Sequence, residues 1–462
     1  MTIWPPSKLE TGGPRYLGLA ESLARAVASG ELPEGARLPT HRELADRLGV
    51  TVGTVSRAYA EATRRGLVSG EVGRGTFVRS RKSRYETRPG AEPGLVDLSA
   101  NHPPLLENRA LRDAVERGVL DLVRRAELQS VLDYPAEGGN PRDREAGARW
   151  IARTGLAASP EDVLVCSGSQ HGITTVLATL LSPGELLLTE ELTYPGLKAV
   201  AGLLHLRTRG LPLDEKGLVP EAFADACRKG DARALYLVPT IHNPTGTLMP
   251  EARRREIAEI ARTHDVALVE DDIHALLPVE RPRPVSAYAP ERSYYLMSTS
   301  KTLVAGLRVS YVAAPPGMFS RLAANLRATA WAAPPLMAAL ASAWIEDGTA
   351  DALLLARRQA AALRQALARE RLLGLRYDAH PASYFAWVHL PEPWRSDTFV
   401  AEARAHGLAV TPAEVFLVGR GAPPHAVRVC LGAARSELEL EKGLRALVAA
   451  VASGREGARA VL

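Results

Sequence analysis

The chain has 462 residues, of which 46% are hydrophobic and 24% are charged, and its formal net charge is +5 at pH 7. This length predicts two or more domains, the composition excludes a disordered chain, and the mild positive charge is compatible with a nucleic-acid partner. The sequence lacks a stretch apolar enough to span a membrane, a signal peptide in residues 1–10 and paired cysteine spacings, which predicts a cytoplasmic protein with no membrane partner and no metal site.

The first eighty residues have the pattern of three short helices followed by a β-hairpin. Residues 16–29 place their apolar side chains on one helical face. Thr40 and Thr51 are N-cap residues for two further helices, each followed by a glycine at its expected end. Two short β candidates, 66–69 and 76–78, flank a glycine-containing tip. Together these elements predict an α+β winged helix-turn-helix.

Residues 80–94 are basic and polar and contain proline and glycine. They show neither helical nor strand periodicity, which is typical of a linker. The sequence therefore predicts an N-terminal domain of residues 10–79, which we call the reader, and a C-terminal domain of residues 95–462.

The C-terminal domain alternates short apolar runs with helical stretches. Continuous apolar strands joined by helices indicate a parallel sheet that is buried on both faces. We expect a large part of about residues 125–320, and a smaller subdomain of about 321–462 together with 95–124. The predicted strands of the large part are 163–166, 185–189, 234–238, 266–269 and 293–297.

Two segments after predicted strands carry groups that suit a phosphorylated aldehyde. Lys301 can form a Schiff base, with Ser298 and Arg308 as phosphate ligands, although an ordinary surface lysine would look the same. Ser169 and Gln170 open a helix, where backbone N–H groups and a hydroxyl can cradle a phosphate. Alone, such a turn is weak evidence.

Two further segments place polar side chains at strand ends. Glu270, Asp271 and Asp272 end an apolar strand, where one carboxylate can keep a pyridine nitrogen protonated. The alternative is a helix N-cap. Asn243, in the string Asn-Pro-Thr-Gly, can donate to a phenolic oxygen, and the alternative is a polar turn.

Taken together, these segments resemble the fold-type I aminotransferase family of pyridoxal-phosphate proteins over residues 95–462. The resemblance implies that Lys301 bonds pyridoxal 5′-phosphate, that Asp271 pairs with the ring nitrogen and that Asn243 donates to the phenolic oxygen. It also implies four phosphate ligands and one ring-stacking aromatic residue: Ser169, Gln170, Ser298 and Arg308, and Tyr194.

Three more positions follow from this resemblance. Arg428 is similar to the clamp for a substrate or effector α-carboxylate. Tyr134 resembles the tyrosine that reaches the phosphate of a neighbouring subunit, which implies a homodimer. His274 stands where the family usually has a tyrosine that binds the phenolic oxygen, and it can donate a hydrogen bond there or be an ordinary core histidine.

Three strings in the reader, at 39–45, 49–59 and 73–77, carry a second resemblance, to the GntR-type winged helix over residues 16–78. In such a unit the third helix enters the major groove and the second crosses the DNA backbone. The resemblance implies DNA contacts by four side chains: Arg42, Thr51, Thr54 and Arg57. Arg74 at the wing tip would reach the minor groove, whereas the alternative is a basic domain used for protein contacts.

The two halves in this order resemble the MocR-type transcriptional regulators over nearly the whole chain. The predicted fold is therefore a winged helix-turn-helix followed by an α/β, fold-type I domain with a smaller α/β subdomain. The resemblance implies a homodimeric regulator that binds double-stranded operator DNA. Its effector would be pyridoxal phosphate or an amino compound that forms an external aldimine. The alternative is an aminotransferase acting on an amino acid and a 2-oxo acid, with an auxiliary DNA-binding domain; we expect residual transamination rather than a primary enzyme.

Overall fold

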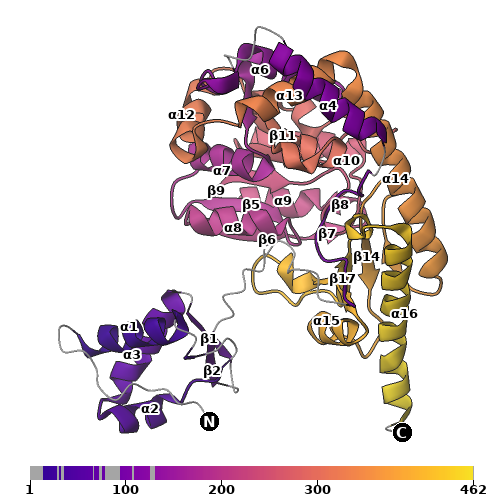
Figure 1. Cartoon of the computed structure of the whole chain (residues 1–462). Coiled ribbons are helices and arrows are strands. Elements are labelled where there is room, and N and C mark those ends of the chain that lie inside the picture. Colours follow the sequence, from indigo (N-terminus) through magenta and orange to yellow (C-terminus); the bar gives the residue numbers. More distant parts are fainter. Residues whose placement is uncertain are drawn as a thin grey trace. The chain divides into compact units, whose positions relative to one another are not determined.

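The computed structural model describes residues 14–28, 31–32, 36–65, 67–71, 75–78, 94–106, 109–124 and 131–460. The chain divides into two compact units, residues 1–89 and 90–462, each with its own hydrophobic core (Figure 1). Within the described residues, no helix has both the length and the apolar character that crossing a membrane requires.

The N-terminal unit contains the three helices and the hairpin that the sequence predicts. Its elements are α1 (Arg15–Ala28), α2 (His41–Leu48), α3 (Val52–Arg64), β1 (Val68–Glu71) and β2 (Gly75–Val78). The two strands pair in antiparallel register. The core side chains are at most 4% exposed and include Leu19, Leu23, Leu44, Val55, Tyr59 and Val68. The predicted winged helix is confirmed.

Capping residues set the boundary between α2 and α3. The hydroxyl oxygen of Thr40 accepts a hydrogen bond from the Glu43 N–H at 3.3 Å, and the Glu43 carboxylate accepts from the Thr40 N–H at 2.8 Å. This reciprocal pair is a capping box. Gly49 ends α2 with φ +60°, a left-handed conformation that favours glycine, and Thr51 then caps α3. Both N-caps predicted from the sequence are confirmed.

The large unit is built on a seven-stranded sheet in the order β4-β12-β11-β10-β9-β5-β6. All five strands predicted from apolar runs lie in it. One strand, β12, is antiparallel to both of its neighbours, so the sheet is mixed rather than wholly parallel. The strands are β4 (Val163–Cys166), β5 (Leu186–Glu190), β6 (Arg207–Leu211), β9 (Ala232–Leu237), β10 (Ala267–Asp271), β11 (Ser293–Ser298) and β12 (Ser310–Ala313).

Helices cover both faces of this sheet (Figure 1). Because successive strand residues point to opposite faces, Leu187 and Tyr236 pack into the cluster under α7, α8 and α12, whereas Leu188 and Leu235 pack against α9 and α10. The helices are α4 (Arg109–Arg124), α6 (Pro141–Ala152), α7 (Ser169–Leu180), α8 (Pro195–Leu203), α9 (Pro220–Cys227), α10 (Glu251–Thr263), α11 (Thr299–Thr302), α12 (Phe319–Ala330) and α13 (Pro335–Asp347).

A second, four-stranded sheet has the order β13-β14-β17-β16. Near it, β3 pairs in parallel with β15, so the chain immediately after the predicted linker is held beside C-terminal strands. The predicted subdomain boundaries remain predictions. The remaining elements are β3 (Val96–Asp97), β7 (Leu213–Asp214), β8 (Gly217–Leu218), β13 (Tyr377–Asp378), β14 (Ala386–His389), β15 (Leu408–Ala409), β16 (Thr411–Pro412), β17 (Ala426–Val429), α14 (Thr349–Arg371), α15 (Ser396–Ala405) and α16 (Glu437–Ala460).

Candidate functional site

The candidate cofactor site lies where neighbouring parallel strands end. β10 ends at Asp271, β11 ends shortly before Lys301, and Asn243 follows β9. The carboxyl ends of parallel strands meet at one edge of a sheet, and open α/β sheets bind their ligands there. The topology thus gathers three of the residues that the sequence singled out.

Asp271 is buried, and one of its two carboxylate oxygens lacks a partner. Its Oδ2 accepts a hydrogen bond from the Tyr236 hydroxyl at 2.6 Å, while Oδ1 is buried with no hydrogen-bond partner among the described residues. Burial raises the pKa of Asp271 to about 7, although the hydrogen bond from Tyr236 opposes this rise. A protonated ring nitrogen would supply the missing donor and stabilise the ionised form.

Lys301 lies in the short helix α11, which Ser298 caps by accepting a hydrogen bond from the Ser300 N–H at 3.1 Å. The Lys301 ammonium donates to the carbonyl oxygen of Asn101. Burial lowers the pKa of Lys301 to about 8, and the charges of Arg428 and Arg308 act in the same direction. A larger fraction of this amine is therefore neutral near pH 7 than for an exposed lysine, which makes it a better nucleophile.

Arg428, on β17, connects the second sheet to the strand ends. Its Nη1 donates to Asn243 Oδ1 at 2.7 Å and its Nη2 donates to the Ser99 carbonyl oxygen at 2.8 Å. Its Nε is buried and has no partner among the described residues. The guanidinium also lies 4.8 Å from the ring centre of Phe416. A buried cation with an unused donor fits a ligand carboxylate.

The start of α7 forms a candidate phosphate site. Gly168 has φ +84°, and a Cβ atom there would lie 2.3 Å from Nη2 of Arg308, so the guanidinium lies directly against the turn before Ser169. Gln170 Nε2 donates to the Gly196 carbonyl at 2.9 Å, and its Oε1 is buried without a partner among the described residues. A cation beside a helix N-terminus is suited to an anion.

His274 is fully buried, at 0% exposure, and its ring centre lies 5.9 Å from that of Phe385. Neither ring nitrogen has a hydrogen-bond partner among the described residues. Burial, with the positive charges of Lys301 and Arg428, lowers the pKa of His274 to about 3. The imidazole is therefore neutral at physiological pH, when it has one donor and one acceptor nitrogen.

The two predicted tyrosines lie in different environments. Tyr194 precedes α8, and a Cβ at Gly196 would lie 2.3 Å from its ring, so the glycine lets the chain pass close to the aromatic side chain. Tyr134 is 79% exposed, and its ring centre lies 5.4 Å from that of Trp331, which is 54% exposed. Within one chain Tyr134 is therefore a surface residue.

Several side chains of this site have buried polar atoms without hydrogen-bond partners among the described residues. Each buried unsatisfied polar group costs about 1–3 kcal/mol, so such a group indicates a ligand. In this site these atoms are Asn101 Oδ1, Gln170 Oε1, Asp271 Oδ1, both ring nitrogens of His274, and Arg428 Nε; others, such as Trp150 Nε1 and Tyr311 Oη, lie elsewhere in the described residues. An acid, an amine, a carboxylate clamp and a cation at a helix N-terminus fit pyridoxal phosphate.

Sequence reasoning missed three residues of this site. Tyr236 looks like any apolar strand residue, yet its hydroxyl holds Asp271. Ser99 and Asn101 contribute through backbone carbonyl oxygens, which bind Arg428 and Lys301. Backbone contacts of this kind leave no side-chain signal. The one sequence cue for Tyr236 was its hydroxyl, which is the only polar side-chain group in the apolar run 234–238.

The reader has a different kind of surface. Arg42, Thr51 and Arg57 are exposed, and the Thr51 and Thr54 hydroxyl groups lie 2.9 Å apart at the start of α3. A cleft of about 460 Å³ runs between these α3 residues and the start of α1, where Arg15, which sequence reasoning had missed, forms part of its lining. Arg74 lies outside the described residues.

Sequence comparison assigns both units to families. Residues 93–447 match the aminotransferase class I and II family, and residues 15–78 match bacterial regulatory proteins of the gntR family. An uncharacterized HTH-type transcriptional regulator of Bacillus subtilis, YdeF, is 30% identical over 449 residues, which cover 96% of each chain. The HTH-type pyridoxine biosynthesis transcriptional regulator PdxR of Corynebacterium glutamicum is 30% identical over 319 residues, 67% of this chain and 68% of PdxR.

A solved structure extends the comparison to the fold. It is that of LysN, an α-aminoadipate aminotransferase from Thermus thermophilus, complexed with N-(5′-phosphopyridoxyl)-L-leucine. The two chains share a TM-score of 0.70 and 25% identity, over 79% of this chain and 93% of the other. The large unit therefore has the aminotransferase fold.

Proposed function

Because the chain belongs to the aminotransferase class I and II family, in the MocR architecture that joins such a domain to a gntR-family reader, we propose that it is a pyridoxal-phosphate-dependent, DNA-binding transcriptional regulator. The observation that carries this proposal is a winged helix in the same chain as a site whose residues carry buried polar atoms without partners in the described part of the chain, Asp271 Oδ1 and Arg428 Nε among them. The DNA that the reader would bind implies a cytoplasmic location.

Pyridoxal phosphate, when bound, supplies an aldehyde that condenses with primary amines and a ring that withdraws electrons. Lys301 would hold the aldehyde carbon, and Asp271, positioned by Tyr236, would keep a proton on the ring nitrogen. Asn243 and His274 would donate to the phenolic oxygen. The phosphate ligands would be Ser169, Gln170, Ser298 and Arg308, with Tyr194 stacked on the ring.

The effector that fits the remaining part of the site is pyridoxal phosphate itself or a primary amine that carries a carboxylate. Arg428 supports the second class because its buried guanidinium has an unused donor. PdxR, by its name, regulates pyridoxine biosynthesis, which favours the cofactor as one signal. Either ligand can shift the protein between two states only if it binds them with unequal affinity.

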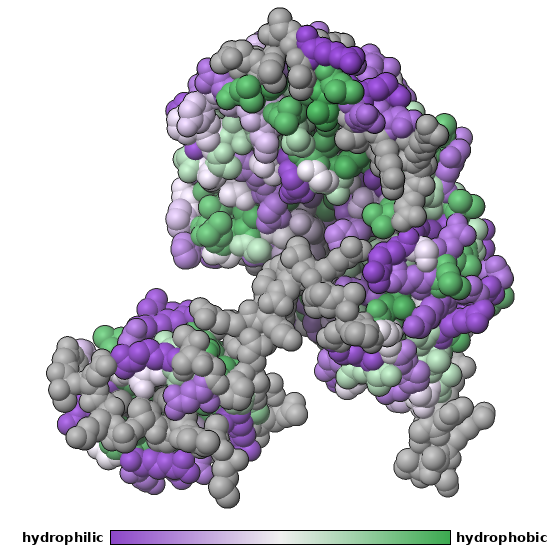
Figure 2. Space-filling model, in the orientation of Figure 1, coloured by the Kyte–Doolittle hydropathy of each residue, from purple (hydrophilic) through white to green (hydrophobic). Residues whose placement is uncertain are grey.

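We also propose a homodimer. Apolar side chains are exposed on the large unit, and Figure 2 shows hydrophobic surface over the end of that unit where Figure 1 places α12 and α13. Clustered exposed apolar surface usually marks an interface. The exposed residues of this region include Leu132, Tyr134, Trp331 and Leu336. Burial of Tyr134 in such an interface would bring it to the partner's phosphate site, as the family resemblance implies.

A second candidate function is catalysis of transamination. The lowered pKa of Lys301, about 8, and the clamp at Arg428 favour it, because both are needed to process an amino acid. Steady turnover of an amino donor and a 2-oxo acid at about 1 per second or faster would favour an aminotransferase over a transcriptional regulator. Turnover far below that rate, together with DNA binding, favours the regulator.

Selection of genomic fragments by the purified full chain, followed by nuclease protection, tests the proposed function. We expect a protected operator whose affinity changes when pyridoxal phosphate is added. The variant Lys301→Ala should protect the same operator but should lose the response to the cofactor. Absence of sequence-selective protection with and without cofactor would contradict the proposal.

A further inference from the structure

One short segment contacts Lys301 and two of the arginine residues whose charges act on it, Arg428 and Arg357. We call residues 99–104, between β3 and α4, the strap. Three cations donate to its backbone carbonyl oxygens: Arg428 to Ser99, Lys301 to Asn101, and Arg357 to Pro104. In this arrangement the strap takes up hydrogen-bond donors that the cofactor and an effector would need.

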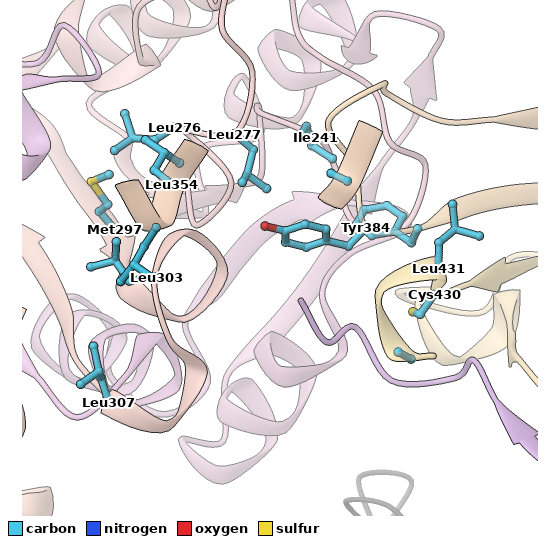
Figure 3. Close-up of a cluster of buried hydrophobic side chains, with 14 of the residues drawn as sticks. Ile241, Leu276, Leu277, Met297, Leu303, Leu307, Leu354, Tyr384, Cys430 and Leu431 are labelled. Atoms are coloured by element: carbon cyan, nitrogen blue, oxygen red, sulfur yellow. The ribbon is translucent and has the colours of Figure 1, made fainter. Parts of the chain in front are cut away.

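The strap is closely packed on the 3₁₀ turn Leu431–Ala433. A Cβ atom at Gly432 would lie 2.1 Å from the His102 carbonyl oxygen, so only a glycine leaves room for the strap at this point. The Cys430 N–H donates to the Leu98 carbonyl at 2.8 Å, just before the strap begins. Figure 3 shows Cys430 and Leu431 on one side of Tyr384, whose hydroxyl donates to the Lys301 carbonyl at 2.7 Å. The Gly432 N–H donates to the Tyr384 carbonyl at 2.9 Å, so the turn beneath the strap also contacts the residue that holds the Lys301 carbonyl.

A ligand carboxylate would compete with Ser99 for Arg428. A carboxylate binds a guanidinium through two adjacent nitrogens. Because Nη1 of Arg428 holds Asn243, the edge left for a carboxylate is that of Nε and Nη2. Nη2 donates to the Ser99 carbonyl at 2.8 Å, while Nε is unused among the described residues. A charged acceptor forms the stronger hydrogen bond, so a carboxylate on this edge would draw Nη2 away from the neutral Ser99 carbonyl.

Release of Ser99 from Arg428 costs little because its carbonyl keeps other donors. The Thr411 hydroxyl donates to it at 2.7 Å, and the Cys430 thiol lies 3.5 Å from it. Asn101 differs because its carbonyl accepts a hydrogen bond from the Lys301 ammonium. When the cofactor is bonded to the Lys301 nitrogen, that nitrogen has fewer hydrogens to donate. The cofactor therefore removes the bond at the middle of the strap, and a carboxylate removes one of the bonds at its beginning.

We propose that the strap is the effector-responsive element of the site, and that a carboxylate-bearing amine releases it by taking Arg428 from Ser99. Arg357, whose guanidinium also donates to the Leu303 carbonyl at 2.7 Å, keeps the far end of the strap in place. The near end continues through β3 to residues 79–93 and then to the reader, so the strap is the part of the site closest in sequence to the DNA-binding unit. This inference rests on the proposed function.

Two reduced conjugates that differ only in the carboxylate test the proposal on the wild-type chain. They are N-(5′-phosphopyridoxyl)glycine and N-(5′-phosphopyridoxyl)methylamine, each added to cofactor-free protein at saturation. Hydrogen exchange would be followed in peptides that cover the strap. We expect the glycine conjugate to accelerate exchange of the His102 amide, which donates to the Ala100 carbonyl at 2.8 Å, by about fivefold or more over the methylamine conjugate.

Equal or slower exchange with the glycine conjugate, when both conjugates are bound, would overturn the strap proposal. Operator affinity measured in the same samples separates this failure from failure of the proposed function. If hydrogen exchange in the strap responds but no operator is bound, the proposed regulatory function is wrong. The competition between the carboxylate and Ser99 for Arg428 is then still supported. If the operator is bound and the conjugates act on it equally, the strap is not the responsive element.

The substitution Gly432→Ala provides an independent test that leaves Arg428 in place. Its methyl group would occupy the position now held by the His102 carbonyl oxygen, 2.1 Å away, and should displace the strap without ligand. We expect fast strap exchange in the ligand-free variant, similar to wild type with the glycine conjugate. The control is Gly202→Ala, in α8, where a Cβ meets no atom within 4 Å. Wild-type protection of the strap in a folded Gly432→Ala protein would contradict the proposal.

Discussion

The reader and the cofactor site expose their functional groups in opposite ways. Arg42 and Arg57 of the reader are exposed to solvent. In the cofactor site, Asp271 and His274 are at most 2% exposed and have polar atoms without partners among the described residues. The buried groups of the cofactor site therefore lower the stability of the fold when no ligand is bound. The exposed arginine residues of the reader do not.

This difference decides what kind of evidence identifies each ligand. Buried groups without partners cost free energy, so the cofactor site is recognisable from the chain's own geometry. The exposed arginine residues of the reader carry no such free-energy cost, so their geometry is the same as that of an ordinary solvated surface. The gntR-family match is what identifies the DNA partner.

The largest expected effect is at Lys301. The substitution Lys301→Ala removes the amine that would hold the aldehyde, and it should abolish the visible absorption band that the wild-type protein shows with pyridoxal phosphate. Absorption spectroscopy after removal of free cofactor measures this directly. Lys442, on α16, offers the matched control, since Lys442→Ala should leave the band unchanged. A band of wild-type intensity in Lys301→Ala would contradict the assignment of this lysine.

The position of Lys301 could be predicted from the sequence because its context is local. A serine- and threonine-containing turn after an apolar strand fixes where the lysine lies, and parallel strands that end together bring it to Asp271 and Asn243. Tyr236 could not be predicted, since a tyrosine within an apolar run is usually a core residue, and only the fold places its hydroxyl 2.6 Å from Asp271.

Two other features depended on distant parts of the chain. The reversed direction of β12 follows from how the chain returns across the sheet, which no local pattern encodes. The contacts of Ser99 and Asn101 use backbone carbonyl oxygens, which every residue has. The helices and caps of the reader, in contrast, depend on neighbours within a few residues, and the sequence predicted Thr40 and Thr51 correctly.

The next largest effect concerns pH and Asp271. Its pKa is about 7 in the folded protein, against an ordinary value of 3.8, because the carboxyl group is buried. At a pH between these two pKa values, Asp271 keeps its proton in the folded state and has lost it in the unfolded state. The free energy of unfolding therefore falls as pH rises from about 4 to about 7. In cofactor-free protein this fall should be about 2–3 kcal/mol larger in wild type than in Asp271→Asn between pH 5 and pH 8.

Urea unfolding followed by tryptophan fluorescence measures this difference, because five of the six tryptophans lie between residues 150 and 394. Asp265→Asn is the control, since the Asp265 side chain is 99% exposed. Saturating pyridoxal phosphate should reduce the pH dependence of wild type, because a protonated ring nitrogen stabilises the ionised carboxylate. Identical pH profiles for wild type and Asp271→Asn would show that this carboxyl group titrates normally.

A smaller effect is expected in the reader. Arg57→Ala removes an exposed cation from α3 and should weaken operator binding by about 1–3 kcal/mol, with a shallower dependence on salt if the contact is to phosphate. Arg64→Ala on the same helix is the matched control, because Arg64 pairs with Glu61 at 2.7 Å near the helix end. Fluorescence anisotropy at several salt concentrations distinguishes the two. Equal losses for both variants would indicate a general charge effect rather than a contact at Arg57.

The smallest effect is expected at the start of α2. Thr40→Ala removes the hydroxyl that caps the helix and should destabilise the reader by about 1 kcal/mol. Hydrogen exchange at the Leu44 amide, which donates to the Thr40 carbonyl at 2.9 Å, should accelerate about fivefold. The hydrogen bonds to Thr40 also lower the pKa of Glu43, so this pKa should rise in the variant. Thr63→Ala is the control, since the Thr63 hydroxyl donates within α3 to the Tyr59 carbonyl. If operator affinity falls as much as it does for Arg57→Ala, the exposed reader surface depends on its local fold more than the comparison with the cofactor site implies.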